Sequence, residues 1–147
     1  MGRNGDLCMT LGLTASNSVR IRVDLSGLRA VSCGCCCIES SAYNFVLSNF
    51  SLVGETCTIT NESDAPACLS GWLYVSVVGR SGNYPQEYWL PEWIIAPQGQ
   101  VVLTSGGSGA TTKPNAIHLT NAFIYNNAGD TSQLYAPDGT LVSSISA

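Results

Sequence analysis

The stretch NNAGDTSQLYAPDGTLVSS, residues 126–144, decides the fold class. Thr131, Gln133 and Tyr135 alternate with smaller or apolar residues, which is the period of two expected for a half-buried strand. Pro137-Asp138-Gly139 then interrupts the alternation: proline presets φ, aspartate bonds nearby backbone and glycine accepts positive φ. Because the alternation resumes at Leu141, the stretch predicts a β-hairpin.

Strand patterns of the same kind recur outward from this hairpin, and no window keeps the apolar period of a capped helix. The segment EYWLPEWII contains Pro91, which places it at a sheet edge or splits it. The other segments are VRIRVD (19–24), YNFVLSNF (43–50), ETCTITN (55–61), GWLYVSVV (71–78), VVLTS (101–105), and NAIHLT with AFIY (115–125). About nine short strands separated by turns predict an all-β sandwich.

The chain has 147 residues, which is enough for one domain with a hydrophobic core. Charged residues make up 11% of it, against about 25% in typical domains. Either serine, threonine, asparagine and glycine supply the polar surface, or partners cover much of that surface, and the composition leaves both explanations open. Six basic residues and a net charge of −4 argue against nucleic-acid binding, which needs clustered lysine and arginine.

No run of 18 apolar residues is present, so we expect no transmembrane helix. The opening MGRNGDLCMTLGLTAS is a poor signal peptide because Asp6 and several threonines and glycines interrupt its apolar region. We therefore expect an intracellular protein, in which the glycosylation sequons at Asn49 and Asn61 are chance matches.

Seven cysteines cannot all pair within one chain. Four of them form the cluster Cys33, Cys35, Cys36 and Cys37. This cluster has one half of the spacing of a structural zinc site, but Cys57 and Cys68 do not supply the second half. S-acylation of the cluster is a second possibility. The favoured interpretation is free thiols used as small apolar residues in a reducing compartment, with no metal or cofactor.

No catalytic set is visible in the sequence. His118 is the single histidine and falls in an alternating segment, and the carboxylates are scattered. SGGSG (105–109) lacks the Gly-Lys-Ser/Thr of a phosphate-binding loop. Asp130 and Asp138 lack the ligand run of a calcium loop. We therefore expect a protein that is not an enzyme.

Four pieces in order resemble the lamin tail domain, an immunoglobulin-like β-sandwich. They are LSNFSLVGETCTITNESD (47–64), CLSGWLY (68–74), IIAPQGQVVLTSG (94–106) and the closing hairpin. The resemblance implies structural roles for Gly54, Glu55, Asn61, Gly71, Trp72, Asp130, Asp138 and Gly139, with Trp72 as the core tryptophan. Cys68 departs from the pattern, because the family usually has aspartate ahead of Leu-Ser/Thr-Gly.

The resemblance implies a sandwich over residues 43–147. Residues 1–42 fall outside the resemblance, and we expect them to form an N-terminal extension with an added strand at VRIRVD and the cysteine cluster as a connection. Related domains in lamins act as interaction modules, and others occur in cilia and flagella. We therefore expect a non-catalytic structural module docked on protein subunits of a large intracellular assembly, with a ciliary axoneme or another cytoskeletal complex first. A nuclear or chromatin adaptor and a zinc- or ligand-binding sandwich are the alternatives. The candidate contact residues are Tyr84, Tyr88, Trp89 and Trp93, because aromatic side chains dominate contact energies.

Overall fold

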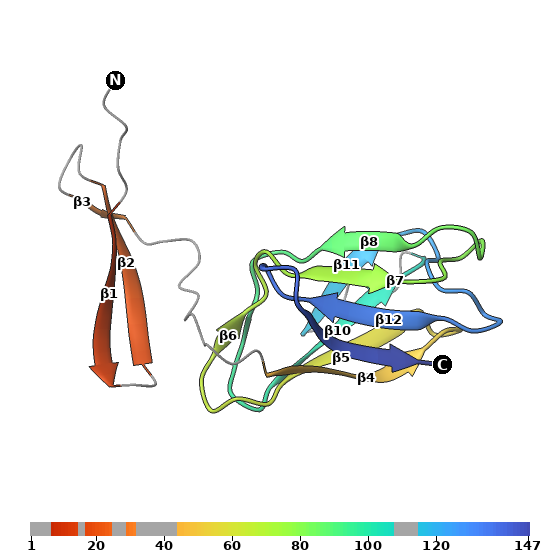
Figure 1. Cartoon of the computed structure of the whole chain (residues 1–147), viewed down its shortest axis with the longest axis horizontal. Helices are drawn as coiled ribbons and strands as arrows, with labels where there is room; N and C mark the ends of the chain where they lie inside the picture. Colours follow the sequence, from red (N-terminus) through yellow and green to blue (C-terminus); the bar gives the residue numbers. More distant parts are fainter. Residues whose placement is uncertain (1–6, 15–16, 25–28, 32–43, 108–114) are drawn as a thin grey trace, which may run out of the picture.

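The protein folds into layers of short, mostly antiparallel strands (Figure 1). A computed structural model describes residues 7–14, 17–24, 29–31, 44–107 and 115–147. The described residues contain thirteen strands and no helix. This is the all-β class that the alternating segments predict.

Two four-stranded sheets form the sandwich, and Figure 1 shows the second in front of the first. The first sheet has the order β11 (Ala116–Thr120), β10 (Gln100–Ser105), β5 (Thr56–Asn61) and β4 (Phe45–Ser51). The second has the order β13 (Leu141–Ser146), β12 (Thr131–Tyr135), β7 (Leu73–Ser76) and β8 (Gln86–Trp89). A two-stranded ladder joins β6 (Ala67–Cys68) to β9 (Ile94–Ile95). All pairings in the sandwich are antiparallel except β10 with β11.

A separate three-stranded antiparallel sheet precedes the sandwich in the sequence. It has the order β1 (Leu7–Thr14), β2 (Asn17–Asp24) and β3 (Arg29–Val31). The alternation of VRIRVD predicts β2, whereas β1 and β3 were not predicted.

The closing hairpin is present as predicted. Thr131 pairs with Ser146 at its open end, and the turn at Gly139 has a φ of 86°. The Asp138 carboxylate accepts a hydrogen bond from the Thr140 N–H at 2.9 Å. The turn therefore uses each residue for the reason that proline, aspartate and glycine are favoured there.

Alternate residues of each strand fill the space between the sheets. Tyr74 and Leu134 come from one sheet, Ile59 and Leu103 come from the other, and all four are fully buried. Trp72 packs edge-on against Phe45, with ring centroids 4.8 Å apart, and is 4% exposed. Along one side of the sandwich the Leu47 N–H donates to the Ser143 Oγ at 3.0 Å, which ties β4 to β13.

One predicted strand is wrong. Residues 122–125, AFIY, form no ladder, and their backbone groups bond side chains instead, as described below. The alternation failed there because apolar residues in a buried connection look the same as those in a short strand. Pro91 does split its segment, into the edge strand β8 and the short β9.

Replacing Trp72 with alanine should lower the free energy of unfolding by about 3–5 kcal/mol, because it opens a large cavity in the core. Trp89 is the matched control, since it is 71% exposed and Trp89→Ala should cost less than about 1 kcal/mol. Urea unfolding followed by circular dichroism checks both variants. Equal losses for the two variants would contradict this placement of the core.

Candidate interaction surface

The Glu55 carboxylate is buried at the start of β5, with 3% of the residue exposed. Its Oε2 accepts hydrogen bonds from the Ser105 hydroxyl at 2.5 Å and the Ile124 N–H at 2.8 Å, and Oε1 accepts from the Tyr125 N–H at 3.4 Å. Glu55 also has a φ of 52°, an unusual backbone conformation for a residue other than glycine. The side chain thereby joins β5, β10 and the connection after β11.

Asp130 is a second buried carboxylate and precedes β12. Its Oδ1 accepts from the Val78 and Thr131 N–H groups at 2.9 and 2.7 Å. Its Oδ2 accepts from the Ser76 hydroxyl at 2.7 Å and the Asn126 N–H at 3.1 Å. Asp130 therefore fixes the turn that leads into the closing hairpin and the end of β7 together.

Glu55 and Asp130 between them hold residues 124–126, which have no strand partner. Three consecutive N–H groups donate to the two carboxylates, and the Ser76 hydroxyl lies 3.1 Å from the Ile124 carbonyl. Buried backbone groups need such partners, and here side chains replace a sheet ladder. We call Glu55, Asp130 and residues 124–126 the carboxylate lock.

Asn61 plays a similar part at the other end of β5. Its amide nitrogen donates to the carbonyls of Ala65, Ile95 and Ala96 at 2.8–3.2 Å. Its amide oxygen accepts from the Ser63 N–H at 3.0 Å. The residue is 1% exposed and ties the loop after β5 to β9.

A polar cluster lies within the core. The Tyr74 hydroxyl is 2.7 Å from the Tyr125 hydroxyl and 2.6 Å from the Ser132 hydroxyl. Burial raises the pKa of the Cys57 thiol from 9.0 to about 11, although hydrogen bonding to Tyr74 and Ser132 opposes the shift. Burial also raises the pKa values of both tyrosines, Tyr74 especially. All of these groups therefore stay neutral at physiological pH.

The buried polar side chains are engaged with other groups of the protein. No buried side-chain nitrogen or oxygen lacks a hydrogen-bond partner in the described part of the chain. Within those same residues, no group of three histidine, cysteine or acidic side chains could hold a metal ion. His118, the residue nearest in type to a base, bonds Thr104 through Nδ1 at 3.0 Å and Asn121 through Nε2 at 2.8 Å.

The outer face of the second sheet carries an apolar row that crosses all four strands. The strand registers pair Leu141 with Tyr135, Tyr135 with Leu73, and Leu73 with Trp89. Trp89 is 71% exposed and Leu141 is 47% exposed, while Tyr135 and Leu73 are half-buried. Directly opposed side chains are neighbours on one face of an antiparallel sheet, which places Tyr135, Leu73 and Trp89 side by side. Leu141 pairs with Tyr135 across a register shift between Leu134 and Tyr135, and we call these four residues the apolar row.

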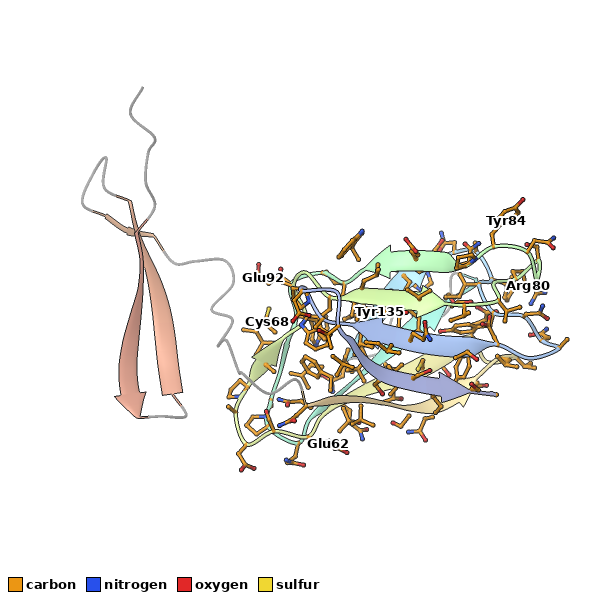
Figure 2. All side chains as sticks on the ribbon, viewed as in Figure 1. Glu62, Cys68, Arg80, Tyr84, Glu92 and Tyr135 are labelled. Atoms are coloured by element: carbon orange, nitrogen blue, oxygen red, sulfur yellow. The ribbon has the colours of Figure 1, made fainter. Side chains whose placement is uncertain are left out.

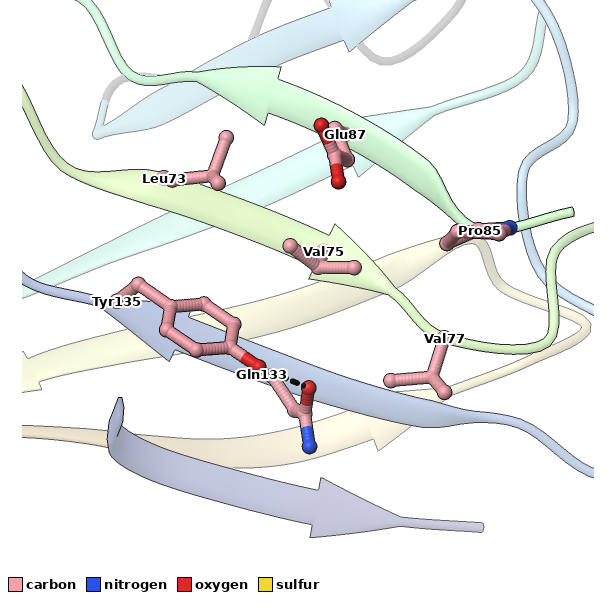
Figure 3. A pocket seen from close by; sticks show the side chains of 7 residues that line it. All are labelled: Leu73, Val75, Val77, Pro85, Glu87, Gln133 and Tyr135. Atoms are coloured by element: carbon pink, nitrogen blue, oxygen red, sulfur yellow. Dashed lines mark hydrogen bonds between the residues drawn. The ribbon is translucent and has the colours of Figure 1, made fainter. Parts of the chain in front are cut away.

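A shallow groove of about 290 Å³ lies beside the apolar row (Figure 3). Glu87 is the one charged side chain among its lining residues, and the Tyr135 hydroxyl donates to the Gln133 Oε1 at 2.7 Å within it. Leu73, Val75, Val77 and Pro85 complete the lining. Val75 is 6% exposed yet stands outside the core cluster, which shows that neighbours on the outer face cover it.

The structure separates the four predicted contact residues into two pairs. Tyr84 and Trp89 are exposed, at 72% and 71%, whereas Tyr88 and Trp93 are half-buried and pack against the core. Tyr84 and Arg80 lie at one end of the sandwich, and Cys68 and Glu92 lie toward the other (Figure 2). The sequence analysis missed Leu73, Tyr135 and Leu141 as surface residues. The sequence shows the alternation within each strand, but it does not show which strands are neighbours in the sheet.

The family-motif glycines occupy demanding positions. Gly71 has a φ of 79° just before Trp72, and Gly139 has a φ of 86° in the hairpin turn. A side chain at Gly54 would come within 2.7 Å of the Ser51 Oγ. The cysteine cluster at 33–37 lies outside the described residues. Zinc binding and S-acylation of this cluster therefore stay predictions.

Replacing Glu55 with alanine should lower the free energy of unfolding by about 3–5 kcal/mol, because it leaves three donors buried and unsatisfied. Glu62→Ala removes an exposed carboxylate and should change stability by less than about 0.5 kcal/mol. Urea unfolding followed by tryptophan fluorescence compares them. A loss of under 1 kcal/mol for Glu55→Ala would show that the carboxylate lock does not hold the fold.

The stability of the protein should fall as pH rises above 9. Because the folded-state pKa of Cys57 is raised to about 11, its contribution is complete below pH 9 and is lost between pH 9 and 11. Cys57→Ala should therefore remove about 1–1.5 kcal/mol of the change in unfolding free energy between pH 8 and pH 10. Urea unfolding at the two pH values measures it, with Cys68→Ala as the control that keeps Cys57. An unchanged pH dependence in Cys57→Ala would refute the assignment.

No helix among the described residues is long and apolar enough to span a membrane. The comparison with curated proteins gave no significant match. The family model described as Lamin Tail Domain matches residues 39–147. That match covers most of the chain, including the carboxylate lock, the closing hairpin and every strand of the sandwich. The chain belongs to the lamin tail domain family.

Proposed function

We propose that this chain is a non-catalytic interaction module that docks on protein subunits of a larger intracellular assembly through the outer face of the β13-β12-β7-β8 sheet. The apolar row is the observation that carries the proposal. A sheet face that turns toward solvent normally alternates to polar residues, yet Leu141, Tyr135, Leu73 and Trp89 follow one another across this one. Contiguous exposed apolar surface marks interaction sites.

The family supports a binding role, because the lamin tail domain is a non-enzymatic immunoglobulin-like domain. The buried acids support it too, since both oxygens of each carboxylate accept hydrogen bonds from backbone N–H groups or serine hydroxyls. The anchor expected from the structure is Trp89, a large aromatic side chain that is mostly exposed and stands at the end of the apolar row. Tyr84 is exposed as well but lies away from the row, so we assign it no part in this contact.

The assembly that we propose first is a ciliary axoneme or another cytoskeletal complex, on the occurrence of related domains there. A nuclear adaptor is the alternative, and the family name favours it. Chromatin contact through DNA has little support from charge, because Arg80 is the only lysine or arginine among the described residues of the sandwich. Contact with a nuclear protein remains compatible with the same docking face.

Site-specific photo-crosslinking in the native cell tests the proposal. A benzophenone amino acid placed at position 89 or 141 should give the same discrete protein adduct, because both positions lie on one face. Position 53 is the control, since Val53 is 83% exposed and lies outside the row. Identification of the adduct as a ciliary, cytoskeletal or lamina protein decides between the assemblies. No adduct at 89 and 141, or the same adduct at 53, would overturn the docking face.

A further inference from the structure

The sandwich has an open strand edge at β8. Among the described residues, β8 is hydrogen-bonded to a neighbour on one side only, β7. The opposite edge of that sheet, β13, packs against β4 of the other sheet, where the Leu47 N–H reaches Ser143. An unpaired edge presents backbone donors and acceptors that a further strand can use.

The ladder identifies which residues of β8 face outward. The Leu90 N–H donates to the carbonyl of Trp72, the residue just before β7, at 2.9 Å, so the backbone of residue 90 faces the β7 side. Backbone groups alternate between the two sides of an antiparallel strand, so Tyr88 also bonds inward to β7. The N–H and C=O groups of Glu87 and Trp89 therefore point to the open side, and both of these side chains are exposed.

Charge indicates the chemistry of the segment that would pair there. The described residues of the sandwich, 44–107 and 115–147, hold seven acidic side chains and one arginine, Arg80. Arg80 lies in the connection that leads into β8, but its guanidinium is 5.2 Å from the Phe123 ring centroid and donates to the Tyr125 carbonyl at 3.5 Å, so these two contacts engage its charge. Glu87 has no basic neighbour across the ladder: it pairs with Val75 of β7, and Val75 pairs with Gln133 of β12.

We propose that β8 accepts an extended, basic segment of a partner protein as a fifth strand, antiparallel to β8. An apolar residue of that segment lies beside Trp89 and continues the apolar row, and a lysine or arginine two positions later lies beside Glu87. The recognised pattern is apolar-x-basic, read by backbone bonds to Glu87 and Trp89 and by these two side chains. This inference rests on the proposed docking function and adds the class of partner.

The flanking prolines limit the ladder. Pro85 and Pro91 lack N–H donors and stand on either side of β8, so only a few residues can pair. Short edges with proline and charge also prevent uncontrolled edge-to-edge association. Pairing of β8 with the β8 of a second copy is disfavoured, because it would bring two acidic sandwich edges together and place no cation of either edge beside Glu87.

A peptide titration on the full chain tests the proposal. The probe is the peptide acetyl-Thr-Leu-Thr-Arg-Thr-amide, and binding is followed by amide chemical shifts in nuclear magnetic resonance spectra. Shifts should centre on Glu87 and Trp89, and the probe should bind about tenfold more tightly than the same peptide with glutamate for arginine. Glu87→Arg should reverse that preference. Glu62→Arg, an exposed change away from the edge, should leave it intact.

Methylation of the peptide backbone separates strand addition from side-chain contact. N-methyl groups on the leucine and arginine remove the donors that would face β8 and should weaken binding at least about tenfold. N-methylation of the central threonine, whose N–H points away, should be tolerated. Equal binding of the two methylated peptides, or no binding at millimolar concentration, would overturn strand addition. A dimer of this chain that Glu87→Arg changes would overturn the basic partner segment as the occupant of the β8 edge. Crosslinks at positions 89 and 141 would still stand in those cases, which distinguishes failure of this inference from failure of the docking face.

Discussion

The buried Glu55 carboxylate is the interaction on which the rest of the structure depends. A carboxylate removed from water is costly unless it is paired or hydrogen-bonded, and here a serine hydroxyl and two backbone N–H groups satisfy it. In return the connection after β11 can cross the end of the sandwich without a strand partner. That connection leads to Asp130 and so to the closing hairpin, whose two strands carry Tyr135 and Leu141, half of the apolar row.

The position of the carboxylate lock explains how one sandwich has both a stable core and an exposed apolar face. The hydrogen bonds of Glu55 and Asp130 lie inside the molecule, between the ends of the sheets. The outer face of the second sheet makes none of these bonds. That face can then hold exposed apolar side chains at little cost to stability, because the core is already complete behind it. Tyr74 and Leu134 point inward from the same strands that present Leu73 and Tyr135 outward.

Two explanations of the low charge content were open from composition alone, a polar surface without charge and a surface covered by partners. In the structure, each explanation applies to a different part of the surface. Ser144 and Ser146 of β13 are exposed polar residues without charge, whereas the groove on β12, β7 and β8 is lined mostly by apolar residues around a single carboxylate. The two explanations therefore apply to different faces of one molecule, and the composition averages over them.

The sequence by itself determined the all-β class, the closing hairpin, the family and the burial of Trp72, because alternation, turn residues and short motifs are local signals. It failed at residues 122–125, where buried apolar residues are held by side chains from distant strands. Only the tertiary structure decided that Glu55 and Asp130 meet the same connection, and that Leu141, Tyr135, Leu73 and Trp89 stand in one row. The physical reason is register: a strand shows which of its residues share a face, but only its hydrogen-bonded neighbours determine which other residues complete that face.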